Sequence, residues 1–346
     1  MEKAPNLKQW GILYEMSRAI RKLAPWNHMG KMDIISIMLP DYKEPVYCSV
    51  NGLAKNEAIS ISFHLGYDAF ETFRFFNATV NDEMHFLMAL EQDCLICFFG
   101  EEKELERKDI EIIESIELLY KIEKSENDTI YFRTLKPGHP LWYIDFEQAD
   151  LLIDAMKNFI AAFTELSDRK IKADFDKGEI IARYYLSQKS EWINAVSQLP
   201  PLHQKKGHLA IDNELLNAFK NIKKLEDTHL ELETAYLPVP IQGDRDLKPI
   251  LPRFVLMANR ANMMLLAHHF IEKEDSVEEC MIDMLFQYVQ KMGIPSHIYV
   301  RDHRTAYYVG DFCEKLGIAL VMSKGMPAAN MLIDKMIYSI VTTETL

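Results

Sequence analysis

The sequence contains no long apolar run. None of its hydrophobic stretches approaches the roughly 18 residues that a membrane-spanning helix requires. The opening MEKAPNLKQW is charged and lacks the apolar stretch of a signal peptide. These absences argue against a membrane span and a secretory leader, so we expect a cytoplasmic protein with no membrane partner.

Cysteine is scarce and odd in number. The chain has five cysteines, which are Cys48, Cys94, Cys97, Cys280 and Cys313. Such a set does not make a secreted disulfide framework. Cys94 and Cys97 have the spacing of metal ligands, but the segment DCLICFFG around them is typical of a buried strand, and no second cysteine pair completes a four-ligand site. We therefore expect core thiols, with no metal and no cofactor.

Positive charge is also in short supply. Lys and Arg number 39 against 52 Asp and Glu, which gives a formal net charge of -13. Polyanions are held mainly by basic side chains, so this balance disfavours broad binding to nucleic acid. A basic cluster is formed by Lys205, Lys206, Lys220, Lys223 and Lys224. It is typical of a solvated helix face, with a small nucleic-acid contact as the alternative.

Common catalytic signatures are missing. The sequence has no G-x-S-x-G elbow, Walker A loop, G-x-G-x-x-G turn or H-E-x-x-H helix. The pair His268-His269 lies in a predicted strand, where neighbouring side chains point to opposite faces, so the pair alone cannot supply two ligands to one metal. The catalytic residues, if any exist, are unknown from the sequence.

An α/β pattern is present in the C-terminal hundred residues. Short apolar runs bounded by Gly, Pro or charge predict strands over 254–259, 263–271, 297–301 and 318–322. Helical stripes follow the last three of these runs, and one of them opens with the capping box Ser276-x-x-Glu279. We expect the strands at 297–301 and 318–322 to be parallel neighbours joined by a helix over 305–316.

The N-terminal half has a similar mixture with more α+β character. Helices are predicted over 7–23, near 69–76 and 82–90, over 108–120 and after the capping box Asp145-x-x-Gln148, and strands over 33–39, 46–50, 58–64, 94–99 and 130–134. The charged stretch from Ser167 to Gly178 lacks a strong apolar pattern and marks a boundary. The sequence therefore predicts an α/β protein of two domains with mixed sheets, covering 1–168 and 169–346.

Both halves show a common order of elements. Further elements are predicted as strands at 179–186 and 229–237 and a helix at 212–223. When the C-terminal half is counted from 229–237, each half contains three strands followed by helix, strand, helix, strand and helix. Ribonuclease H-like domains have this order. There is no residue-level repeat between the halves, so the similarity is one of topology alone.

Several segments resemble a known family. They include Trp10-x-x-Leu13-Tyr14-Glu15, the run Tyr47 to Gly52, the run Phe132 to Trp142, and the C-terminal pieces YLPVPIQ, LPRFVLMAN and IYVRD. Together they resemble a family of uncharacterised bacterial two-domain proteins of unknown function. Some relatives carry a Cys-rich zinc-binding tail of the SEC-C type, which is absent from this chain, so the resemblance implies a domain layout but no zinc site, activity or catalytic residues.

A candidate ligand site lies after the two parallel strands. In open α/β sheets, ligands bind beyond the carboxyl ends of such strands, where Asp302, His303, Arg304 and Lys324 would gather. The alternative is that Asp302 caps the next helix while its neighbours are solvated. A ribonuclease H-like site also needs a carboxylate on the first strand, which we place near Ala258 or Asn259. Neither residue is acidic, and Asn259 completes the candidate ligand-binding set.

Two hypotheses of function follow. The first is a non-catalytic binding or interaction protein whose partner is a protein or a small molecule. The second is a metal-dependent hydrolase or phosphodiesterase with a degenerate ribonuclease H-like site. They differ in the need for metal, because two-metal phosphodiester chemistry requires several acidic oxygens that converge on Mg²⁺ or Mn²⁺.

Overall fold

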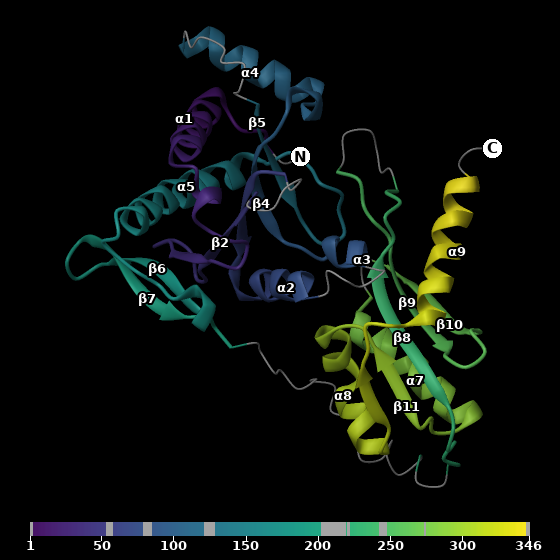
Figure 1. Cartoon of the computed structure of the whole chain (residues 1–346). Helices are drawn as coiled ribbons and strands as arrows, with labels where there is room; N and C mark the ends of the chain where they lie inside the picture. Colours follow the sequence, from purple (N-terminus) through teal and green to yellow (C-terminus); the bar gives the residue numbers. More distant parts are fainter. Residues whose placement is uncertain are drawn as a thin grey trace. The chain divides into compact units, whose positions relative to one another are not determined.

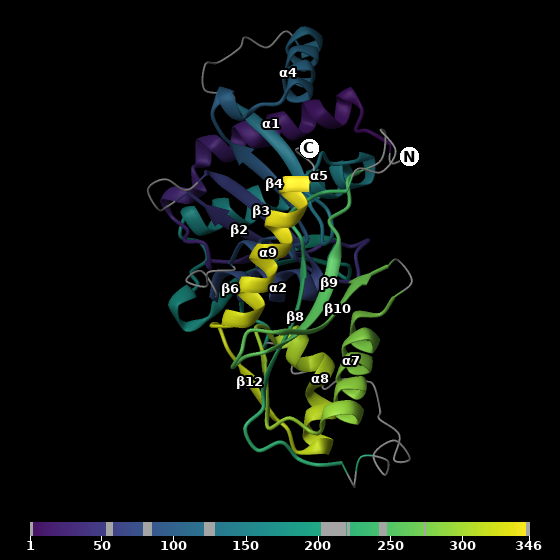
Figure 2. The ribbon, with the colours of Figure 1, turned by 90° about the vertical axis from the view of Figure 1, so that its right-hand side faces the viewer.

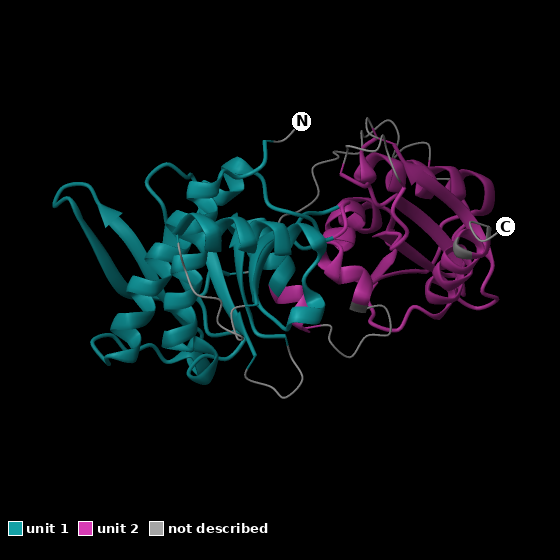
Figure 3. Cartoon of the chain, turned by 90° about the horizontal axis from the view of Figure 1, so that it is seen from above, with its two compact units in different colours: residues 1–73, 92–137, 141–201 teal, residues 74–91, 138–140, 202–346 magenta. Residues whose placement is uncertain are grey.

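The chain forms two compact units, shown in Figure 3. A computed structural model describes residues 3–52, 58–78, 85–120, 129–201, 219, 222–241, 248–272 and 275–343. Unit 1 comprises Met1–Phe73, Gln92–Pro137 and Leu141–Pro201, and unit 2 comprises Arg74–Glu91, Gly138–Pro140 and Leu202–Leu346. Among the described residues, no helix combines the length and the apolarity needed to cross a membrane.

Unit 1 is built on a seven-stranded mixed sheet with the order β5-β4-β3-β2-β1-β6-β7. All neighbouring pairs are antiparallel except β1 and β6, which are parallel. The strands are β1 Ile35–Met38, β2 Val46–Asn51, β3 Ser60–Leu65, β4 Cys94–Phe99, β5 Ile130–Leu135, β6 Glu179–Leu186 and β7 Glu191–Gln198.

Two long helices cover one face of this sheet (Figure 1). They are α1 Leu7–Leu23 and α5 Phe146–Ser167, and each begins with a complete capping box, from Asn6 and Asp145 respectively. Such boxes satisfy amide groups that the first helical turn leaves unpaired. The acidic helix α4 Arg107–Tyr120 and the short 3₁₀ turns η1 Pro25–Asn27, η2 Glu102–Glu104 and η3 Phe175–Lys177 complete the unit.

The opposite face of the seven-stranded sheet is more polar. Phe70 and Phe73 of helix α2 (Gly66–Ala78) pack there in a small apolar cluster. Beside this cluster, His64 and Ser49 are buried on β3 and β2, and the imidazole Nε2 lies 3.0 Å from the Ser49 hydroxyl. Residues of α2 from Arg74 onward belong to unit 2.

Cys94 and Cys97 lie on the buried strand β4, which confirms the strand predicted from DCLICFFG. Burial raises the pKa of both thiols, that of Cys97 to about 12. Both thiols therefore remain protonated at neutral pH, as core cysteines do.

Unit 2 is built on a five-stranded mixed sheet with the order β10-β9-β8-β11-β12. The strands are β8 His229–Tyr236, β9 Arg253–Asn259, β10 Leu265–Ile271, β11 His297–Val300 and β12 Ala319–Met322. β8, β9 and β10 form an antiparallel meander, whereas β11 is parallel to both β8 and β12. The expected parallel pairing of the segments after 297 and after 318 is confirmed, and β8 is the central strand.

Helices cover both faces of this sheet (Figures 1 and 2). On one face, α7 Val277–Met292 and α8 His303–Leu316 pack in a cluster with Leu230 and Leu232 of β8. On the other face, α9 Pro327–Thr343 packs against Ala235 of β8 and against β9, together with Leu87 of the short helix α3 His85–Ala89.

The structure differs from the sequence analysis at three points. Residues up to Pro201 belong to unit 1, in which β6 pairs with β1, whereas the sequence predicted a domain boundary after residue 168. Strand β7 was not predicted, since its alternating residues are only partly buried. The two halves share an order of elements but not a topology, because β4 and β5 extend an antiparallel meander whereas β11 and β12 are parallel. Part of the sequence analysis falls outside the described residues. This part includes Lys205, Lys206 and Lys220 and the predicted helix 212–223, of which the structure describes 219, 222 and 223 alone.

Candidate functional site

Two buried glutamates lie side by side on the central strand of unit 2. Glu231 and Glu233 have exposed fractions of 0% and 2%. Their positions alternate with Leu230 and Leu232, so the leucines pack toward α7 and α8 while the glutamates point to the α9 face. A central strand therefore carries two carboxylates into the interior, where an ionised group needs a partner.

Glu233 is bound by an arginine from the end of β11. Arg301, itself 4% exposed, donates from Nε to Glu233 Oε2 over 2.6 Å. The same guanidinium donates from Nη2 to Asn330 Oδ1 of α9 over 2.5 Å and from Nη1 to the Lys324 carbonyl over 3.2 Å. Arg301 thus joins β8, β11 and the first turn of α9 through one planar group.

Glu231 is bound by a second arginine and by a helix terminus. Arg260, which follows β9, donates from Nη1 to Glu231 Oε1 over 2.7 Å and to the Gly325 carbonyl over 3.0 Å. The other carboxylate oxygen, Oε2, accepts the backbone N–H of Ala329 over 2.8 Å. Ala329 lies in the first turn of α9, where unpaired amides and the helix dipole favour a negative charge.

In this glutamate–arginine cluster, burial and the neighbouring donors shift the pKa of each carboxyl in opposite directions. Burial raises the pKa of Glu233 to about 7, while the Arg301 guanidinium opposes the rise. Burial also raises the pKa of Glu231, against the Ala329 amide and Arg260. All four carboxylate oxygens accept a hydrogen bond from the protein, the remaining one being Glu233 Oε1, which accepts the Thr234 amide at 3.2 Å. A metal ion at this point would have to compete with these donors and with the positive charge of two arginines.

A column of rings continues this face beyond the glutamates. His297 stacks on His229 with ring centroids 4.4 Å apart, His229 stacks on Tyr299 at 5.7 Å, and Arg260 lies 4.3 Å over the Tyr299 ring. The His229 Nδ1 is 3.1 Å from the Tyr299 hydroxyl. All four side chains are partly exposed, so the ring column is a polar, aromatic surface.

Asp302, the centre of the predicted ligand site, caps a helix. Its Oδ1 accepts the Thr305 amide and its Oδ2 accepts the Thr305 hydroxyl, both over 2.8 Å, and it is the N-cap of α8. His303 stacks on Phe75 at 4.7 Å, and Arg304 donates to Glu91 over 2.7 Å. The capping alternative for Asp302 therefore agrees with the structure.

The two remaining predicted residues are held by other groups. Lys324 Nζ donates to the carbonyl of Ala78 over 3.0 Å. Asn259 stands at the start of the β9–β10 turn, where its Oδ1 accepts the amides of Ala261 and Asn262. The predicted residues therefore make separate contacts in the loops and helices around the sheet.

The expected first-strand carboxylate was assigned to the wrong strand. Ala258 and Asn259 lie on β9, the second strand of the meander, whereas β8 comes first and occupies the centre. The signal was present in the sequence. His229 to Tyr236 reads HLELETAY, in which two acids share one face of a strand whose other face is leucine. The partners Arg260, Arg301 and Asn330 carry no comparable signal, because only the fold brings them together.

Comparisons with known proteins yield family matches without an activity. The model of a family described as "Domain of unknown function (DUF7309)" matches residues 10–183, and that of a second, described as "Domain of unknown function (DUF6930)", matches residues 215–337. No curated protein matches the chain.

Proposed function

The chain belongs to the DUF7309 family, which has no assigned activity, and we propose that it is a non-catalytic, cytoplasmic binding or interaction protein. One observation carries the proposal. The buried carboxylates at the centre of unit 2 are held by Arg260, Arg301 and a helix amide, so each is already bound by a donor of the protein.

The order of unit 2 supports a ribonuclease H-like fold without its chemistry. Such domains have a three-stranded meander followed by helix, strand, helix, strand and helix. Unit 2 has this order of elements, with the sheet order β10-β9-β8-β11-β12. In a catalytic member, carboxylates from the first and fourth strands hold Mg²⁺ or Mn²⁺. Here the guanidinium of Arg301 follows the fourth strand and binds Glu233 with a fixed positive charge.

The ring column is the surface that best suits a ligand. Imidazole, phenol and guanidinium groups offer ring faces and hydrogen bonds to a planar or acidic group of a small molecule or a protein. The net charge of -13 disfavours nucleic acid as the partner.

The first test is enzymatic. The purified full-length chain is assayed with Mg²⁺ or Mn²⁺ on bis(p-nitrophenyl) phosphate and on single-stranded oligonucleotides, beside Glu233→Gln and Asp302→Ala variants. We expect no turnover above that of the metal alone. Turnover by the parent that is lost in Glu233→Gln, with the fold retained, would promote the hydrolase hypothesis instead.

The second test concerns binding. A thermal-shift panel of aromatic carboxylates is run on the parent and on His297→Ala, which removes the end of the ring column, with His268→Ala as a control elsewhere on the sheet. We expect a stabilising compound whose effect is lost in His297→Ala and kept in the control. Equal responses in all three proteins would remove the ring column as the ligand surface.

A further inference from the structure

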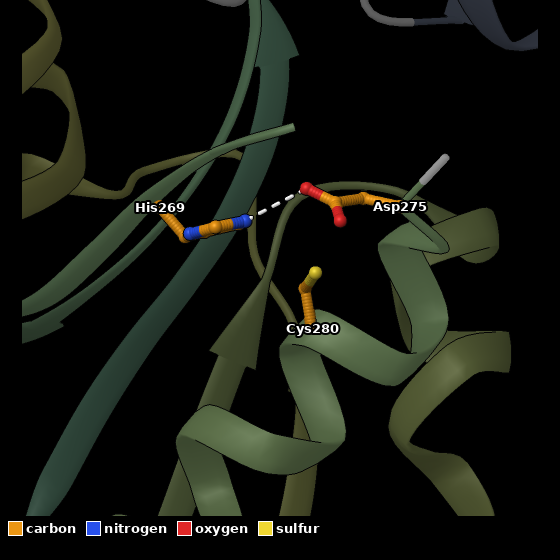
Figure 4. A group of neighbouring side chains, drawn as sticks. All are labelled: His269, Asp275 and Cys280. Atoms are coloured by element: carbon orange, nitrogen blue, oxygen red, sulfur yellow. Dashed lines mark hydrogen bonds and ion pairs between the residues drawn. The ribbon is translucent and has the colours of Figure 1, made fainter. Parts of the chain in front are cut away.

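Three potential metal ligands meet where β10 passes into α7 (Figure 4). His269 comes from β10, Asp275 from the segment before the helix, and Cys280 from the first turns of α7. Their ligand atoms all lie within 4.8 Å of one another, and His269 Nε2 is 2.9 Å from Asp275 Oδ2. In a tetrahedral zinc site, bond lengths of about 2.0 to 2.3 Å place the ligand atoms roughly 3.3 to 3.8 Å apart. The three groups are therefore close to the spacing that a metal requires.

The local structure brings the side chains of His269, Asp275 and Cys280 together. His269 lies on the same face of β10 as Ala267 and Ile271, which pack toward α7. Asp275 is fixed by the amide of Glu272, which donates to its Oδ2 over 2.9 Å. Ser276 caps α7, and the Cys280 amide donates to the Ser276 carbonyl over 2.9 Å, which places the thiol one turn into the helix on the side facing β10 (Figure 4).

We propose that His269, Asp275 and Cys280 bind a divalent transition metal, with Zn²⁺ as the best-suited ion. A nitrogen, a carboxylate oxygen and a sulfur form a mixed set that suits zinc, while the thiol disfavours Mg²⁺ and Ca²⁺, which prefer oxygen ligands. Three protein ligands leave one position of a tetrahedral site for water or an outside ligand. This site lies apart from the glutamate–arginine cluster and does not depend on the proposed function.

The surroundings favour a cation. Asp283 and Glu279 lie near Cys280, so two further carboxylates stand beside the three ligands. A metal binds the thiolate form of cysteine, and binding should therefore release the proton of the Cys280 thiol.

Co²⁺ and Zn²⁺ test the site directly. The full-length chain is stripped with a chelator, then titrated with Co²⁺ to follow the thiolate-to-cobalt absorption band and with Zn²⁺ in competition with a chromophoric chelator. We expect one equivalent of metal, a thiolate band that disappears in Cys280→Ser, and a loss of zinc affinity of at least about tenfold in both His269→Ala and Asp275→Asn. Circular dichroism of each apo variant should match that of the parent.

A matched control comes from the neighbouring residue. His268→Ala removes an imidazole from the opposite face of the same strand, and it should leave both the cobalt band and the zinc affinity unchanged. A parent without a thiolate band, a full equivalent of zinc retained by Cys280→Ser, or an equal loss of affinity in His268→Ala and His269→Ala would each overturn the proposal.

Discussion

At the scale of single residues, His64 is an ionisable group buried in unit 1. It is 2% exposed, its Nδ1 has no hydrogen-bond partner among the described residues, and its ring packs on Phe73 at 4.1 Å. Burial lowers its pKa from 6.5 to about 3. The unfolded chain therefore binds this proton more readily than the folded one, so the stability that His64 contributes is complete above about pH 6.5 and is lost as the pH falls toward 3.

His64→Gln should remove this acid sensitivity. Between pH 6.5 and 4, the parent should lose stability relative to the variant by on the order of 1.4 kcal/mol per pH unit, which is the value of one unit of pKa shift. Urea unfolding of both proteins over that pH range measures the difference, with His268→Ala, which changes an exposed imidazole, as the control. Parallel pH profiles for the parent and His64→Gln would contradict the assignment.

The Glu233–Arg301 pair predicts an asymmetric response to mutation. Arg301→Ala leaves a buried carboxylate without its partner and should cost about 3 to 5 kcal/mol of unfolding free energy. Replacing both groups by apolar ones, as in Glu233→Leu with Arg301→Met, should cost much less, because no charge remains buried. Denaturant unfolding separates these cases, and Arg107→Ala, which removes an exposed pair with Glu111, should cost less than about 1 kcal/mol. A double variant as unstable as Arg301→Ala would count against the reasoning.

Sequence patterns predict the role of some single residues and not of others. Asp302 could be identified as a candidate ligand-binding residue because it follows a strand and precedes a helix. The same position also predicts its alternative role as a helix cap. The pairing of Glu231 with Arg260 could not be predicted, because it depends on the antiparallel pairing of β8 with β9, which places Arg260 beside the start of β8. An arginine in a loop has no local feature that distinguishes a buried partner from a solvated one.

At the scale of elements, α8 illustrates the role of a single cap. Both carboxylate oxygens of Asp302 bind Thr305, which satisfies an amide in the first turn. Asp302→Ala should cost about 0.5 to 2 kcal/mol of stability, whereas Asp302→Asn, which keeps an oxygen at the cap, should cost less. Thermal or urea unfolding measures both variants. Stability unchanged in Asp302→Ala would show that the cap contributes little and would reopen a ligand role for this residue.

The elements themselves were largely predictable. Strands β8, β9 and β11 agree with the predicted runs to within a residue or two, since most of their apolar residues are buried. β12 agrees as well, although it is an edge strand with partly exposed residues, because its apolar run is continuous. β10 starts at Leu265 rather than 263, because Met263 adopts a positive φ of 61° in the turn. β7 escaped prediction for the opposite reason, since an edge strand with little burial has no strong apolar alternation.

At the scale of the whole molecule, the division into units rests on the pairing of β1 with β6. Ile181→Ala removes a fully buried side chain of β6 that faces the core of unit 1, and it should cost about 2 to 5 kcal/mol. Hydrogen exchange should accelerate in β1 and β2, whose core it shares, and much less in β8 and β11. Leu232→Ala on β8 is the matched control and should give the reverse pattern. Acceleration of β8 and β11 by Ile181→Ala would place the unit boundary before β6.

The unit boundary could not be read from the sequence. A charged stretch between 167 and 178 has the composition of a linker, yet in the structure it connects α5 to a strand of the same sheet. Pairing of Ile35 with Ile181 joins residues that are distant in the chain, and local patterns contain no information on such contacts. The order of strands in each sheet, which distinguishes the two halves, cannot be predicted for the same reason.

The parallel pairing of β1 and β6 affects how the chain is made. The ribosome releases the N-terminus first, so β1 and β2 emerge long before Glu179–Leu186 does. Until then one edge of β1 has no partner, and an open strand edge is a template for pairing with other nascent chains. β1 spans only Ile35–Met38, which limits the length of backbone at risk. Synthesis that stalls just after α5 should therefore leave the chain most dependent on chaperones.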